Sequence, residues 1–140
     1  DAFSRMIIGY VLSPTLEAKY TIEALQQAIS HAGGGNLCGT IHHSDRGVQY
    51  CCDEYITLLK EHHIRISMTE DSNPTDNGMA ERVNGIIKNE FLEPLQTPKN
   101  LLEALPLVDH AVRTYNTLRP HLNLNMRTPA QVYEGKQIIL

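Results

Sequence analysis

The sequence predicts an α/β fold for a single domain of 140 residues, with one sheet flanked by helices. Two observations support this. Over roughly the first half of the chain, short apolar runs typical of strands alternate with amphipathic stripes typical of helices, and a mostly helical pattern follows. The composition, 41% hydrophobic and 20% charged, is also that of an ordinary globular protein. Right-handed crossovers would place such strands side by side in one sheet.

The first two predicted strands enclose a helix. Residues 6–12 (MIIGYVL) are a continuous apolar run with β-branched and aromatic members, which predicts a buried strand. Apolar residues then recur at helical spacing from Ala18 to Ile29, which predicts a helix that ends at the glycines 33–35. A short strand is expected around residues 39–42, directly before the polar string HSDRG.

The next part of the chain predicts a helix, a strand and a long helix. The helix is expected over about 52–62, and the alternation of apolar and polar residues at 64–68 predicts a half-buried strand. A polar loop, EDSNPTDN, leads into a long helix from about Asn77 to Leu92, stopped by Pro94.

The C-terminal part, residues 95–140, predicts helices that belong to the same domain. One is expected from Asn100 to Leu118, with Pro106 as a kink or a break. Thr128 and Pro129 have the N-cap and N1-proline pattern of a last short helix.

Composition limits the classes of function. No apolar run approaches the length that crosses a bilayer, so no membrane partner is expected. Three cysteines without CxxC spacing favour a reducing cytoplasm over a disulfide framework, and the histidines and cysteines of residues 42–63 lack the paired spacing of structural zinc. The net charge of −4 does not by itself support a nucleic-acid partner, so any phosphate binding depends on local placement of basic groups.

Two groups of polar residues are candidates for a catalytic site. Asp45 follows a predicted strand, where it is either a turn former or half of a catalytic pair. On the long helix, Asn77, Glu81, Asn84 and Lys88 share one face, which a plain surface helix would also show. The 35 residues between Asp45 and Glu81, followed by Lys88 two turns later, favour the catalytic interpretation.

This spacing resembles the integrase-core superfamily of transposases and retroviral-type integrases, which use two aspartates and a glutamate. The whole chain carries strings similar to its insertion-sequence branch: SRMIIGY (4–10), HSDRGVQY (43–50), NPTDNGMAERVNGIIKNE (73–90), YNTLRPHLNL (115–124) and TP (128–129). The resemblance implies a ribonuclease-H-like mixed sheet flanked by helices. It also implies metal-dependent cleavage of DNA ends and strand transfer, with element ends and target DNA as partners.

The resemblance assigns roles to single residues. Asp45 and Glu81 are the expected catalytic ligands of Mg²⁺ or Mn²⁺ in a two-ion site, because hard cations prefer carboxylate oxygens. Further residues could contact DNA: Lys88, Asn77, Asn84 and Arg46, with His43 and Ser44 as flanking candidates and Arg119 and His121 as either DNA contacts or structural anchors. Asp76 is expected to cap the long helix, and Asp71 to be a loop residue.

The same alignment sets Asp1 against a position in the third strand, so the first catalytic aspartate and two strands are expected before residue 1. The chain alone is then expected to be inactive in strand transfer. The strand at 6–12 is expected to expose an edge, and self-association is expected through that edge or through another exposed apolar face. Three alternatives remain open: a non-catalytic DNA-binding or assembly module of the same fold, an unrelated nuclease of ribonuclease-H-like shape, and a zinc module.

Overall fold

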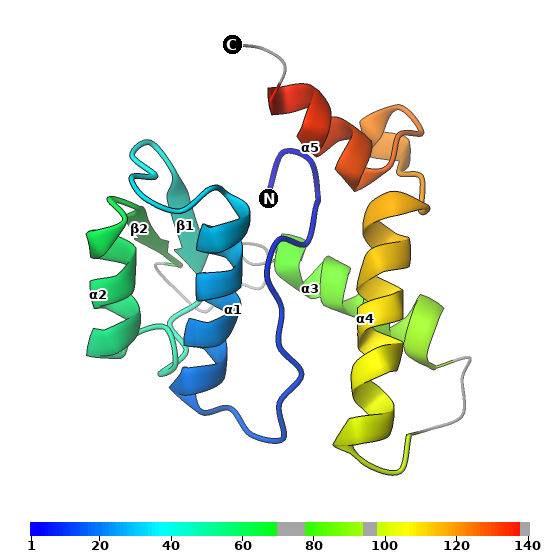
Figure 1. The fold of residues 1–140 in the computed structure, drawn as a ribbon, viewed down its shortest axis with the longest axis horizontal. Coiled ribbons are helices and arrows are strands. Elements are labelled where there is room, and N and C mark those ends of the chain that lie inside the picture. Colours follow the sequence, from blue (N-terminus) through cyan, green and yellow to red (C-terminus); the bar gives the residue numbers. More distant parts are fainter. Residues whose placement is uncertain (70–77, 94–97, 138–140) are drawn as a thin grey trace. The chain divides into compact units, whose positions relative to one another are not determined.

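A computed structural model describes residues 1–69, 78–93 and 98–137 of the chain (Figure 1). By internal contacts the chain divides into two compact units, one of Ile8–Ala80 and one of Asp1–Ile7 with Glu81–Leu140. The elements, in order, are α1 (Ala18–His31), β1 (Ile41–Ser44), α2 (Asp53–Glu61), β2 (Arg65–Met68), α3 (Gly78–Ile86), the π-helix η1 (Ile87–Leu92), α4 (Leu101–Thr117), the 3-10 helix η2 (Leu122–Leu124) and α5 (Pro129–Gln137).

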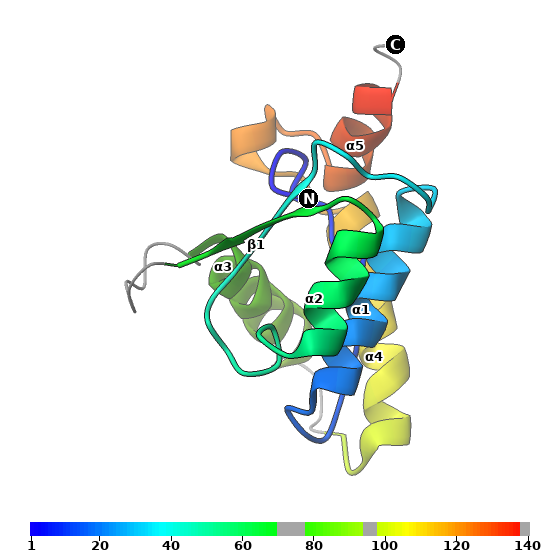
Figure 2. The same ribbon diagram turned by 90° about the vertical axis from the view of Figure 1, so that its left-hand side faces the viewer.

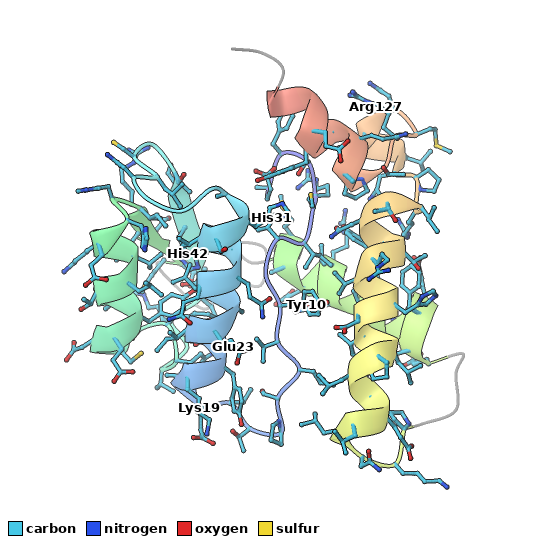
Figure 3. All side chains as sticks on the ribbon, in the orientation of Figure 1. Tyr10, Lys19, Glu23, His31, His42 and Arg127 are labelled. Carbon is cyan, nitrogen blue, oxygen red and sulfur yellow. The ribbon has the colours of Figure 1, made fainter. Side chains whose placement is uncertain are left out.

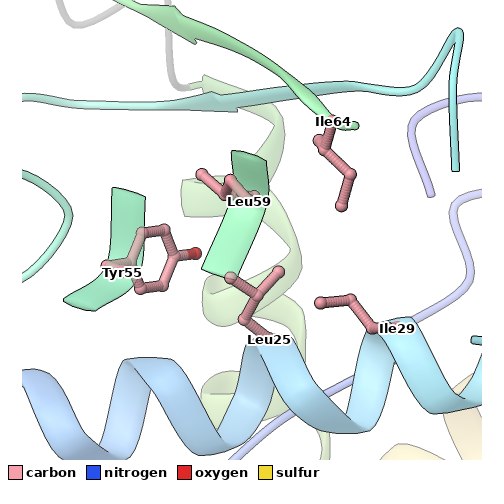
Figure 4. Packing of buried hydrophobic residues seen from close by; sticks show 5 residues of the cluster. All are labelled: Leu25, Ile29, Tyr55, Leu59 and Ile64. Atoms are coloured by element: carbon pink, nitrogen blue, oxygen red, sulfur yellow. The ribbon is translucent and has the colours of Figure 1, made fainter. Parts of the chain in front are cut away.

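In the first of these units, β1 and β2 are parallel and α2 connects them. The register pairs His43 with Ser67 and Ser44 with Met68, so the two strands end side by side. Helices α1 and α2 pack against each other, as Figures 1 and 2 show. The core of this unit consists of side chains from both helices and the residue before β2, namely Leu25, Ile29, Tyr55, Leu59 and Ile64 (Figure 4).

Glycines end α1 and allow another segment to approach it closely. The helix ends as predicted, because Gly33 and Gly34 have positive φ values of 95° and 68° and their N–H groups bond back to Ser30 and Ile29. Gly9 lies on the segment that runs beside α1, where Figure 3 labels Tyr10 and, on the helix, Glu23. A Cβ at Gly9 would overlap the carbonyl oxygen of Ala24, so only glycine permits this close approach.

The other unit is helical. Its buried residues are mostly from α4, α5 and the turn between them, namely Ala111, Val112, Tyr115, Leu124 and Val132, with Ser4 from the N-terminal segment. Pro106 lies inside α4 without ending it. Thr128 caps α5 as predicted, since its Oγ1 accepts from Gln131 N at 3.3 Å and its N–H donates to Gln131 Oε1 at 2.9 Å.

The strand predicted at residues 6–12 is wrong. This segment is extended and half-buried but forms no strand, and its backbone bonds go to side chains: Ile7 to Asn116, and the Tyr10 N–H to Gln27 Oε1 at 3.2 Å. The self-association prediction therefore loses the open strand edge, one of the two surfaces proposed for it, and the alternative of another exposed apolar face stays a prediction. Within the described ranges, no helix is long and apolar enough to cross a membrane.

Candidate active site

Asp45 lies one residue beyond the end of β1 and is half-buried. Its Oδ1 accepts a hydrogen bond from Gly47 N at 2.9 Å, which closes a tight turn around the carboxylate. Burial first, and then the negative charge of Asp45, raise the pKa of the nearby Tyr50. Asp45 is therefore a turn former by geometry, and the turn also holds its carboxylate at the end of the strand.

Arg46 ties this turn to the neighbouring strand. Its Nε donates to the carbonyl oxygen of Thr69 at 2.7 Å, and the Thr69 N–H donates to the carbonyl oxygen of Ser44 at 3.1 Å. Thr69 is buried although its side chain is polar. These two bonds hold the chain that leaves β2 against the turn that carries Asp45.

Two histidines of β1, the strand that ends just before Asp45, bond to neighbouring elements. His42, labelled in Figure 3, is bonded through Nε2 to the Tyr55 hydroxyl at 2.9 Å. Burial, with a smaller effect of His43, lowers the pKa of His42, so its neutral form is favoured. His43 Nδ1 lies 2.9 Å from Ser67 Oγ and joins the paired positions of the two strands. The His42–Tyr55 bond fixes β1 on α2.

Glu81 lies in the first turn of α3 and is exposed, as are Asn84 and Lys88. Lys88 makes a loose ion pair with Glu93 at 3.9 Å, both side chains being mostly exposed. The α-helical spacing predicted for this face holds through Ile86, after which η1 continues with i to i+5 bonds, such as Glu93 N to Lys88 O at 2.8 Å. The predicted residues Asn77, Asp76 and Asp71 lie outside the described residues.

The string YNTLRPH binds segments of its own unit together. Asn116 Oδ1 accepts from Ile7 N at 3.0 Å, and Asn116 Nδ2 donates to Ile7 O at 2.9 Å. The buried Tyr115 ring packs edge-on against His121, with the ring centres 5.0 Å apart. Arg119 donates from Nε and Nη2 to the two carboxylate oxygens of Glu90 at 2.7 and 2.6 Å. Sequence reasoning did not single out Glu90, Asn116 or Thr69, because each acts through a partner distant in sequence.

The donor chemistry of Asp45 and Glu81 fits a hard divalent cation. Both are carboxylates on separate elements, one half-buried in a turn and one exposed on a helix. They belong to different units, so their convergence stays a prediction. Among the residues that the structure describes, no three histidine, cysteine or acidic side chains form a group that could hold a metal ion.

Comparisons with known proteins bear on the whole chain. Two models described as integrase core domain match residues 1–74 and 62–129. The transposase of insertion sequence IS629 from Shigella sonnei is 32% identical over 131 residues, covering 94% of this chain and 43% of that protein. The putative transposase of IS986/IS6110 from Mycobacterium tuberculosis is 34% identical over 97 residues, covering 67% of this chain and 35% of that protein. The chain thus spans less than half the length of either relative.

Solved structures agree on the fold. The HTLV-2 integrase catalytic core domain, in complex with magnesium and in dimeric form, superposes with a TM-score of 0.71 at 26% identity, over 95% of this chain and 79% of that one. The BIV integrase catalytic core domain gives a TM-score of 0.66 at 20% identity, over 96% and 81%. The predicted integrase-core, ribonuclease-H-like class is therefore confirmed, although the sheet of the described residues has only two strands.

Proposed function

Because this chain belongs to the integrase core domain family, we propose that it is catalytic-core sequence of a bacterial insertion-sequence transposase. The reaction is metal-dependent cleavage at the ends of a DNA element, followed by transfer of the freed 3′ hydroxyl to target DNA. The observation that supports this most is the placement of Asp45 beyond β1 and of Glu81 on α3, in a chain of this family. We further propose that residues 95–140 are the C-terminal helical part of the same domain.

Both steps are in-line displacements at phosphorus, in which negative charge grows on the attacking and leaving oxygens. Divalent cations, when bound, activate the nucleophile and stabilise the leaving oxygen. Asp45 and Glu81 would hold them. The turn closed by Gly47 fixes the Asp45 carboxylate, which lowers the cost of ordering that ligand.

DNA contact requires cations or amides that reach solvent near Glu81 and Asp45. We propose Lys88 and Asn84 as direct phosphate or base contacts, since both are exposed: Asn84 lies on α3, which bears Glu81, and Lys88 lies on η1, which continues it. Arg46 is exposed while its Nε donates to the Thr69 carbonyl oxygen, and this supports a contact between its terminal nitrogens and phosphate. Asn77 stays a predicted contact.

A manganese titration followed by nuclear magnetic resonance tests the shared metal site. Mn²⁺ broadens signals of nuclei close to it, so we expect broadening of residues around both Asp45 and Glu81 in the wild type. Replacement of either ligand, Asp45→Asn or Glu81→Gln, is expected to weaken broadening at both places. Asp53→Asn, an exposed acid in the first turn of α2, is the matched control and should leave both unchanged.

Two results would contradict the proposal. Broadening around Asp45 that survives Glu81→Gln unchanged would mean that the two carboxylates do not share a site. A protein that binds duplex DNA but shows no broadening at either carboxylate would be a DNA-binding module without the catalytic metal site.

A further inference from the structure

The helix that carries Glu81 has little apolar packing to hold it. None of the described residues of α3 or η1 is buried, and the apolar side chains Val83, Ile87 and Phe91 are only half-buried. Gly85 weakens the helix further, since glycine costs about 1 kcal/mol relative to alanine in a helix interior. Polar ties at its C-terminal end should therefore have a large influence on where the helix lies.

One such tie is the ion pair between Glu90 and Arg119. Glu90 lies in η1, and two parallel N–H donors of Arg119 meet its two carboxylate oxygens at 2.7 and 2.6 Å. This fork-to-fork geometry restricts direction as well as distance. The side chains are 46% and 25% exposed, which makes the pair modest as a source of stability but well placed as a positional constraint.

The Arg119 end of the pair is anchored. Its backbone N–H bonds to Thr114 O at 3.0 Å at the end of α4, and its Nη1 lies 3.4 Å from His121 Nε2. His121 in turn packs on Tyr115, one of the most buried residues of α4. The guanidinium is thus held by the core of the unit, and η1 packs on α4 (Figure 1).

The charges around the pair favour its ionised form. The hydrogen bond from Arg119, followed by its charge, lowers the pKa of Glu90, and the pair raises the pKa of Arg119. Burial and then the positive charge of Arg119 lower the pKa of His121, which favours the neutral histidine beside the ion pair.

We infer that Arg119 is a positioning residue that acts through Glu90: it fixes η1, which bears Lys88 and continues the Glu81 helix α3, on α4 instead of contacting DNA itself. This inference rests on the proposed function only in so far as that helix serves DNA binding and metal ligation. Of the two roles that the sequence left open for Arg119, this is the structural anchor and not the DNA contact, since the Nε and Nη2 donors that would grip a phosphate are engaged by Glu90.

The decisive variant is Glu90→Gln, examined with Arg119→Ala, the exchange Glu90→Arg with Arg119→Glu, and Arg113→Ala. Removal of a negative charge by itself tightens binding to a polyanion. Weaker duplex binding by Glu90→Gln can therefore come only from loss of the helix position. Arg113, exposed on α4, is the matched control for loss of one positive charge.

Two measurements on the 140-residue chain suffice: anisotropy of a labelled duplex at fixed salt, and amide exchange of residues 86–92. We expect Glu90→Gln and Arg119→Ala to weaken duplex binding and to speed exchange, each by about five-fold as for the loss of one well-formed ion pair. The charge exchange should restore much of both. Arg113→Ala should leave exchange unchanged.

The inference is overturned if Glu90→Gln leaves duplex binding unchanged or tighter while Arg119→Ala weakens it. It is equally overturned if exchange of residues 86–92 matches the wild type in both variants. A wild-type chain that binds no duplex would refute the proposed function instead, and the exchange measurement would still decide the role of Arg119. The ionisation of Glu90 adds a spectroscopic check, because its pKa should return toward the ordinary glutamate value in Arg119→Ala.

Discussion

Asn116→Ala is expected to destabilise the protein by about 2 kcal/mol. In the wild type the Asn116 amide is 8% exposed and makes two hydrogen bonds to the backbone of Ile7, at 3.0 and 2.9 Å. Each lost bond is worth roughly 1 kcal/mol, and a backbone group left unpaired in a buried place costs about 1–3 kcal/mol. Because Ile7 is only half-buried, water can replace part of the lost hydrogen bonding, so the expected loss of stability is at the low end of what these energies allow.

Urea unfolding followed by circular dichroism measures this effect. With a slope of about 2 kcal/mol per molar urea, the midpoint should fall by about 1 M. Asn84→Ala makes the same chemical change at an exposed helical position, and it should shift stability by no more than about 0.5 kcal/mol while weakening DNA binding.

An isosteric variant, Asn116→Asp, separates the two hydrogen bonds to Ile7. Asn116→Asp keeps the acceptor for the Ile7 N–H but sets a carboxylate oxygen against the Ile7 carbonyl, where Asn116 Nδ2 now donates. It should therefore destabilise at least as much as Asn116→Ala. A milder effect of the aspartate, or equal effects of Asn116→Ala and Asn84→Ala, would show that the two bonds to Ile7 do not hold the N-terminal segment.

Three further perturbations test the other unit. Leu59→Ala, at a fully buried position, should cost about 2–5 kcal/mol in urea unfolding, whereas Leu102→Ala, at 82% exposure, should cost under about 0.5 kcal/mol; similar costs would contradict the assigned core. Gly9→Ala should destabilise clearly in a thermal melt, because its Cβ overlaps the Ala24 carbonyl, and an unchanged melting temperature would exclude that close approach. The pKa of His42 is lowered in the folded protein, so the contribution of its neutral form to folding stability is complete above the ordinary histidine pKa of 6.5 and is lost as the pH falls through the folded pKa. His42→Gln should therefore flatten the curve of stability against pH in this range, and an unchanged curve would contradict the assignment.

Local pattern predicted most elements because each depended on neighbours in the chain. The stripe from Ala18 to Ile29 and the glycines after it are enough to begin and end α1, and Thr128 with Pro129 marks the start of α5. The strand predicted at 6–12 was wrong for a nonlocal reason. An apolar run forms a strand only when a neighbour supplies its backbone hydrogen bonds, and here Asn116 and Gln27 side chains supply them.

At the candidate site, too, some features follow from the sequence and others only from the tertiary structure. The sequence by itself determined which carboxylates are candidates, because the position of Asp45 after a strand and the 35-residue spacing to Glu81 are properties of the chain. Only the tertiary structure decided that Arg46 holds Thr69 and that Arg119 holds Glu90, partners 23 and 29 residues apart. A charged side chain takes the nearest partner that the fold supplies, and that choice is invisible in a sequence until packing brings the two groups together.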